Sequence, residues 1–176
     1  MRFCKYMMLS IILPLCFGGA LVAGVPGAWA NEEAPAPTLE DYPFELDLPA
    51  HWTVVESEST TDKLSLAIDT DGGRLTVWSE PGSRPLNEIR AQVVQLASVR
   101  GWQPIRIRRT RIQRHRALAM LYDVPSGALR TRQLFYFFNA GAQRYVLQFG
   151  TKHSTFERRL YRQIAASLRV RPAATL

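Results

Sequence analysis

Six arginines fall within eleven residues of the chain and form its densest charged feature. They are Arg106, Arg108, Arg109, Arg111, Arg114 and Arg116. A guanidinium group presents a planar fork of N–H donors that matches the oxygens of carboxylates and phosphates. The cluster is therefore a candidate surface for an anionic partner. The alternative is an edge strand whose charge keeps it soluble and unpaired with other chains.

Side chains that could catalyse a reaction or bind a metal are few. The histidines His51, His115 and His153 lack the spacing of metal ligands, such as i and i+4 on one helix. We interpret them as surface residues. Ser126, His115 and Asp123 could form a hydrolytic triad on paper, but Ser126 lies in a Pro-Ser-Gly turn and not in a G-x-S-x-G elbow.

One segment has a faint likeness to a calcium loop. It begins Asp69-Thr70-Asp71-Gly72-Gly73, and Glu80 falls at the twelfth position. Arg74 occupies the sixth position, where an EF-hand needs glycine. Leu75 and Val77 then alternate with polar residues, so the segment is predicted to be a hairpin turn. We expect no catalytic residue, no cofactor and no metal site in this chain.

The first 30 residues have the three parts of a secretory signal. Arg2 and Lys5 form the basic part, a long apolar run follows, and Ala28-Trp29-Ala30 supplies a small-residue cleavage site. We predict cleavage after Ala30 and a location in the periplasm or cell envelope. The alternative is a retained N-terminal membrane anchor, because the apolar run is long enough to span a bilayer.

The predicted mature chain has no cysteine, because Cys4 and Cys16 both lie within the signal. It can therefore form no disulfide and offers no thiol nucleophile or thiolate metal ligand. Residues 31–42 are polar, acidic and proline-containing, and are expected to form a flexible leader. A single domain is expected at 43–171, followed by a disordered tail at 172–176.

Charge is distributed unevenly along the predicted mature chain. Residues 31–88 have 13 acidic and 3 basic side chains, whereas residues 89–176 have 2 acidic and 17 basic ones. Either acidic and basic strands lie side by side and form ion pairs, or the second half offers a basic surface to an anionic ligand.

Nucleic acid is not expected as a partner of an exported domain. An acidic protein, an anionic lipid or a polyanionic glycan is expected instead, and the sequence indicates no oligomeric state.

Apolar and polar residues alternate in several segments, which predicts β-strands. The predicted extended segments are 44–48, 52–55, 63–69, 75–77, 102–109, 117–124, 129–139, 144–150 and 168–170. Apolar residues three and four apart predict a helix over 85–99, with Pro85 at its first position and Gly101 at its end. The strand alternation breaks near Arg109, which predicts a bulge or turn there.

A second helix is predicted near the C-terminus. Ser154-Thr155-Phe156-Glu157 has the pattern of a capping box, with Ser154 as N-cap. Phe156, Leu160 and Ile164 would form its buried stripe.

Two central strands, 117–124 and 131–138, are apolar at both odd and even positions, so both of their faces should be covered. The predicted fold is α+β, with a central antiparallel sheet of six to seven strands and two main helices covering its faces as a sandwich.

These features together resemble a known group of exported domains. The chain opens with F-x-L-x-L-P-x-x-W (Phe44 to Trp52), continues with a hairpin, a helix and a strand block rich in tyrosine, and ends on a helix that finishes in Ala-Ser-Leu-Arg. It is similar to the PsbP and DcrB-like group, which shares its fold with the Ran-binding Mog proteins. The resemblance covers about 43–170 and implies a non-enzymatic accessory or binding role. It assigns no site residue.

Our main hypothesis is therefore a non-enzymatic extracytoplasmic binding or accessory protein that engages an anionic partner through the arginine-rich hairpin. The alternative is a small exported hydrolase or isomerase whose catalytic groups are not visible in the sequence. A third interpretation is a structural envelope component that binds no small molecule. A deep pocket holding a titratable pair with opposed pKa shifts would favour the enzyme.

Overall fold

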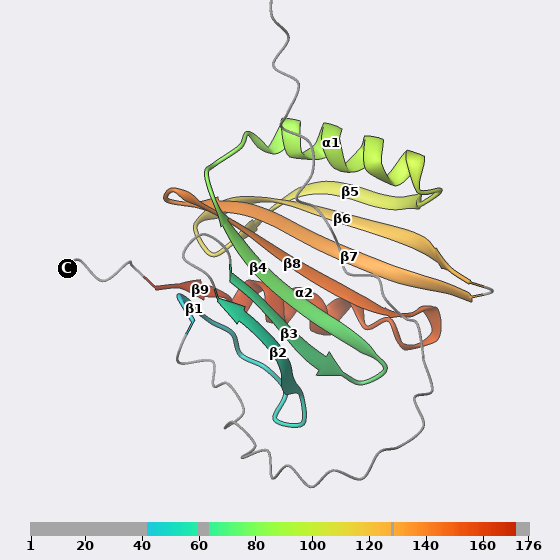
Figure 1. The fold of residues 1–176 in the computed structure, drawn as a ribbon, viewed down its shortest axis with the longest axis horizontal. Helices are drawn as coiled ribbons and strands as arrows, with labels where there is room; N and C mark the ends of the chain where they lie inside the picture. The colour runs from blue at the N-terminus through green and yellow to red at the C-terminus, as the bar shows by residue number, and fades with distance from the viewer. Residues whose placement is uncertain (1–41, 60–63, 128, 172–176) are drawn as a thin grey trace, which may run out of the picture. The chain divides into compact units, whose positions relative to one another are not determined.

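The computed structural model describes residues 42–59, 64–127 and 129–171, which form a seven-stranded antiparallel sheet, a two-stranded ribbon and two α-helices. The strand order in the large sheet is β2-β3-β4-β8-β7-β6-β5 (Figure 1). Its strands are β2 (Thr53–Ser59), β3 (Leu64–Thr70), β4 (Gly73–Pro81), β5 (Gln103–Ile112), β6 (His115–Ser126), β7 (Leu129–Ala140) and β8 (Gln143–Lys152). The fold class predicted from the sequence is confirmed.

The sheet consists of two meanders that are joined at β4 and β8. Strands β2 to β4 follow one another across one half, and β5 to β8 follow one another across the other. The helix α1 (Leu86–Val99) carries the chain from β4 to the far edge strand β5. The meanders meet closely at Gly73, where an added Cβ atom would lie 2.2 Å from the backbone oxygen of Gly150. A glycine is therefore required at this crossing of β4 and β8.

Both faces of the sheet are buried, as the two-sided apolar strands predicted. On one face, alternate residues of β6 and β7 such as Ala119 and Tyr136 pack with the helix α2 (Arg158–Ser167). On the other face, their neighbours Leu118 and Phe135 pack beneath α1. Figure 1 shows the two helices on opposite sides of the sheet. Each face buries a separate hydrophobic cluster, and these clusters position the strands between them.

Helix α1 agrees with its sequence pattern. Its buried residues are Ile89, Val93 and Ala97, spaced four apart along one face. The chain leaves the helix through Gly101, which has a φ of +67° and so adopts a conformation that glycine accepts at low cost. No helix in the described part of the chain is long and apolar enough to cross a membrane.

The predicted start of α2 is wrong. His153–Thr155 forms a short 3₁₀ turn, and α2 begins at Arg158 without a side-chain capping bond. The Thr155 hydroxyl lies 2.7 Å from that of Thr151 and 3.3 Å from the backbone oxygen of Lys152. The segment therefore binds back to the end of β8 and does not cap the helix.

The buried face of α2 is also shifted from the predicted one. It consists of Tyr161, Ile164 and Ala165, while Phe156 and Leu160 are only partly buried. Tyr161 stacks on Phe149 with their ring centroids 4.8 Å apart. This aromatic contact with the sheet sets the rotation of α2 about its axis. The spacing of apolar residues within α2 alone cannot predict that contact.

The two ends of the described chain meet in a small ribbon formed by β1 (Phe44–Glu45) and β9 (Arg169–Val170). The predicted strand at 44–48 is thus much shorter than expected. Tyr42, which we placed at the end of the leader, is buried in the core.

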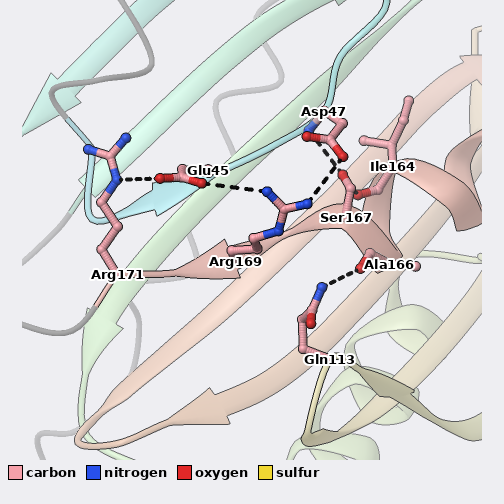
Figure 2. Close-up of polar contacts among 8 residues, drawn as sticks. All are labelled: Glu45, Asp47, Gln113, Ile164, Ala166, Ser167, Arg169 and Arg171. Atoms are coloured by element: carbon pink, nitrogen blue, oxygen red, sulfur yellow. Dashed lines mark hydrogen bonds and ion pairs between the residues drawn. The ribbon is translucent and has the colours of Figure 1, made fainter.

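Figure 2 shows the ion pairs along this ribbon. Arg171 Nε lies 3.1 Å from a carboxylate oxygen of Glu45, and Arg169 lies 3.8 Å from both Glu45 and Asp47. Here the acidic and basic halves of the chain do pair with each other.

Candidate functional site

The arginine cluster lies on the β5–β6 hairpin, whose strands pair from Gln103↔Asp123 to Ile112↔His115. Strand β5 continues through Ile112 without a break at Arg109. The irregularity in register lies instead between Pro104 and Arg106. The predicted bulge near Arg109 is therefore misplaced. The pairing is regular from Arg106 onward, so the arginines that follow the inserted residue alternate between the two faces of the sheet.

This alternation divides the cluster. Arg108 pairs with Ala119, which belongs to the core beneath α2, whereas Arg109 pairs with Leu118, which belongs to the core beneath α1. By the same register, Arg106 shares the α2 side with Arg108, while Arg111 and Arg116 share the α1 side with Arg109. Arg114 lies in the turn. The sequence predicted one charged surface, and the structure separates it into two.

On the α1 side the arginines border a surface depression of about 930 Å³. Its lining includes Leu86, Asn87, Arg109, Arg111, Arg114 and Arg116. Figure 1 shows the start of α1 and the turn between β5 and β6 at the same end of the sheet. The depression thus lies where the first turn of a helix faces the tip of a basic hairpin. We refer to Arg109, Arg111, Arg114 and Arg116 with this depression as the basic pocket.

No carboxylate forms an ion pair with the basic pocket among the residues that the structure describes. The basic residues that do pair with acidic strands are elsewhere: Arg144 with Glu80, and Arg132 with Asp123 at 3.4 Å. Arg111 and Arg116 lie directly opposite each other in the strand register. Two like charges in such a cross-strand pair destabilise the sheet unless an anion compensates them.

The α2 side of the hairpin is packed rather than open. Arg106, Arg108 and Arg158 surround Tyr136 there, with a space of only about 10 Å³ between them. Burial raises the pKa of the Tyr136 phenol above its ordinary value, while the positive charges of Arg108 and Arg158 act in the opposite direction. Burial also lowers the pKa of Arg158, and repulsion from Arg106 and Arg108 adds to this effect. This half of the cluster borders only this small space, although Arg106 and Arg158 are themselves exposed.

The hairpin tip is held in one conformation. Gln113 has a φ of +52°, which makes it the one non-glycine residue with positive φ in the described ranges. Its side-chain amide donates a hydrogen bond to the backbone oxygen of Ala166 at 2.9 Å, near the end of α2 (Figure 2). His115, the next residue but one, packs against Phe138 with 5.7 Å between ring centroids. These contacts hold the backbone of the tip, from which the exposed arginine side chains extend.

Asn139, near the end of β7, adds a polar group to the lining of the basic pocket. Its amide nitrogen donates to the backbone oxygen of Arg84 at 2.8 Å. Its Oδ1 atom is buried and accepts no hydrogen bond from the described residues. No local sequence pattern connects Asn139, Leu86 or Asn87 with the arginines, because they reach the hairpin only through the pairing of distant strands and the path of α1.

The candidate catalytic residues do not assemble. His115 and Ser126 begin and end the same strand, so the triad with Asp123 cannot form. Asp123 is instead bound to Arg132. No group of three His, Cys, Asp or Glu side chains in the described part of the chain could hold a metal ion.

The faint calcium loop is a hairpin turn between β3 and β4, as predicted. Within it, Asp71 accepts a hydrogen bond from His51 at 2.6 Å, and this bond lowers the pKa of the Asp71 carboxyl.

Comparison with solved structures supports the fold. No protein-family model and no curated protein sequence matches the chain. Cyanobacterial PsbP from Synechocystis sp. PCC 6803 is similar in structure, with a TM-score of 0.58 and 12% identity over 82% of this chain and 98% of that one. Protein PA94, of unknown function, from Pseudomonas aeruginosa has a TM-score of 0.50 and 12% identity over 74% of this chain and 99% of its own.

A Bacteroides thetaiotaomicron protein is also similar, with a TM-score of 0.54 and 12% identity over 76% of this chain. The chain spans only 47% of that protein's length. These likenesses confirm the predicted resemblance to the PsbP and DcrB-like fold, and at this identity they concern the fold alone.

Proposed function

We propose that this protein is a non-catalytic, extracytoplasmic binding domain that engages an anionic partner through the basic pocket. The observation that carries the proposal is the set of four arginines that line the depression, three on the α1 side of the β5–β6 hairpin and Arg114 in its turn. No described carboxylate neutralises them. Elsewhere in the fold, basic residues such as Arg144 and Arg169 do pair with the acidic strands. The charge of the hairpin therefore serves something other than internal pairing.

The support for a binding role is geometric. The hairpin tip is fixed by the bond from Gln113 to Ala166, and its arginines border a depression. A backbone that is already ordered has less conformational entropy to lose when the hairpin binds an anion. The support for a location outside the cytoplasm is the sequence of residues 1–30, which has the composition of a secretory signal.

A pull-down from the native cell envelope tests this function. The bait is the full chain, compared with the variant R109Q/R111Q/R116Q and with the control R130Q/R159Q/R162Q. The control removes the same charge from exposed arginines that do not line the basic pocket. Arg108 is unsuitable for the test variant because it is half-buried beside Tyr136.

We expect the native chain and the control to capture the same partner, and the pocket variant to lose it. Capture should weaken as salt rises, because the Debye length falls from about 10 Å at 0.1 M to about 3 Å at 1 M. Equal capture by the folded pocket variant at low salt would contradict the proposal and leave the hairpin charge as a solubility device.

A further inference from the structure

We infer that the basic pocket binds a phosphate group, held mainly by Arg109, Arg111 and Arg116. The inference rests on the proposed function, since it names the chemistry of the anion that this surface would take. It does not involve Arg106 and Arg108, which lie beside Tyr136 and do not line the depression.

Arg111 and Arg116 form a cross-strand pair of like charges. Opposite residues in an antiparallel ladder have Cβ atoms about 4.5–5.5 Å apart, so their guanidinium groups repel each other. Arg109 follows on the same face, two residues along β5. An anion between them converts this repulsion into charge-assisted hydrogen bonds, which are about twice as strong as neutral ones.

The shape and charge of a phosphate suit this set of arginines. A phosphate monoester carries about −1.5 to −2 charges at neutral pH and has three acceptor oxygens. Arginines from two strands can therefore each bind a separate oxygen. A carboxylate offers two oxygens and a single charge, and so leaves more of the cluster uncompensated. Three arginines on one face of the hairpin match the charge of a phosphate better than that of a lone carboxylate.

The start of α1 lines another part of the basic pocket. Leu86 and Asn87 lie there, and the N-cap position is Pro85, which makes no side-chain capping bond. The first N–H groups of a helix have no acceptor within the helix, and they attract anions. They add donors on the side that faces the arginines.

The depression has room for a molecule larger than inorganic phosphate. About 930 Å³ lies within the range of small-molecule pockets, roughly 300–1,000 Å³, and exceeds what inorganic phosphate fills. A phosphorylated small molecule and the headgroup of an anionic lipid share this chemistry.

Titration calorimetry on the full chain tests the inference, with pyrophosphate and glycerol 3-phosphate as soluble probes. Vesicles of phosphatidic acid in phosphatidylcholine form a second arm, with pure phosphatidylcholine as the blank. The variants are R111Q/R116Q, which removes the cross-strand pair, and R159Q/R162Q, which removes two exposed arginines of α2. Circular dichroism melting establishes that each variant is folded, and R116Q alone serves if the double variant is not.

We expect R111Q/R116Q to weaken binding of the probe by about tenfold or more, as the loss of charged hydrogen bonds implies. The control should stay within about twofold, since exposed distant charges are screened. Binding of the soluble probes alone identifies a free phosphorylated ligand, and binding of the vesicles identifies a lipid headgroup.

Absence of phosphate binding by the native chain in both arms would overturn the inference. So would an equal loss in the two variants, or binding of poly-glutamate at the same affinity and with the same dependence on Arg111 and Arg116. In each of these cases, envelope capture that still depends on the arginines would leave the proposed function standing.

Discussion

Gln113 combines a backbone cost with a side-chain bond, and substitutions can separate the two. A non-glycine residue with positive φ costs roughly 1–2 kcal/mol in this left-handed region. Against this, the Gln113 side chain donates to Ala166 O at 2.9 Å. That oxygen belongs to the last turn of α2, where the carbonyl groups receive no hydrogen bond from N–H groups of the helix. Such a hydrogen bond contributes about 1 kcal/mol net to stability.

The change Gln113→Ala removes the bond and keeps the strained backbone, so the free energy of unfolding should fall by about 1 kcal/mol. The change Gln113→Gly also removes the bond, but glycine relieves a strain of about the same size. Its free energy of unfolding should therefore lie within a few tenths of a kcal/mol of the native value. The two variants lack the same contact and differ only in the backbone term.

Urea denaturation measures both effects. With a slope of about 2 kcal/mol per molar, Gln113→Ala should lower the midpoint by roughly 0.5 M, while Gln113→Gly should leave it nearly unchanged. Equal destabilisation by the two variants would show that the positive φ carries no strain. An unchanged midpoint for Gln113→Ala would show that the bond to α2 contributes nothing, and the hairpin tip would not be preorganised in the way we describe.

Three further predictions concern other parts of the fold. Gly73→Ala should destabilise by about 2–4 kcal/mol, the range of severe packing errors, because the added Cβ meets Gly150 O; a chemical melt that matches the native one would contradict this close approach. Ser154→Ala should leave stability unchanged, because Ser154 lies in the 3₁₀ turn and does not cap α2, and a loss near 1 kcal/mol would restore the capping box. His51→Ala should raise the pKa of Asp71 toward its ordinary value, because the His51 bond is the largest cause of the lowered pKa; NMR titration measures this, and an unmoved pKa would refute the bond. The lowered pKa stabilises the folded state above the unfolded-state pKa of Asp71, and this contribution is lost as pH falls through the folded-state pKa.

The sheet could be predicted because the residue patterns that specify its strands, turns and covering helix α1 lie within short segments of the sequence. Strands β6 and β7 are apolar at both parities, which indicated cover on both faces, and α1 and α2 supply it. The turn at Asp71-Gly72 and the stripe of α1 likewise follow from short patterns.

The errors arose where distant contacts decide the structure. Thr155 binds Thr151 on β8, which removes the segment before Glu157 from the helix. The bulge at Ile105 shifts the face of every arginine that follows it. The break in alternation near Arg109 indicated an irregularity in β5. The position of that irregularity depends on how β5 pairs with β6.

The basic pocket was predicted only in part. The six arginines were visible as a cluster, but their division between an open side and a packed side depends on the register of β5 with β6. Asn139 and the start of α1 have no sequence signal that connects them to the hairpin, since the crossover by α1 and the β7–β8 turn bring them there.

Site-specific photocrosslinking in intact cells tests most directly whether the basic pocket is the binding surface. A photoreactive residue at Asn87 lies in the lining of the pocket, and one at Ser98 lies near the other end of α1, roughly 16 Å away at 1.5 Å per residue. We predict an adduct with an anionic molecule from position 87, none from position 98, and loss of the adduct when R111Q/R116Q is added. Equal adducts from both positions, or an adduct at position 87 that persists in R111Q/R116Q, would contradict the assignment of the binding surface to these arginines.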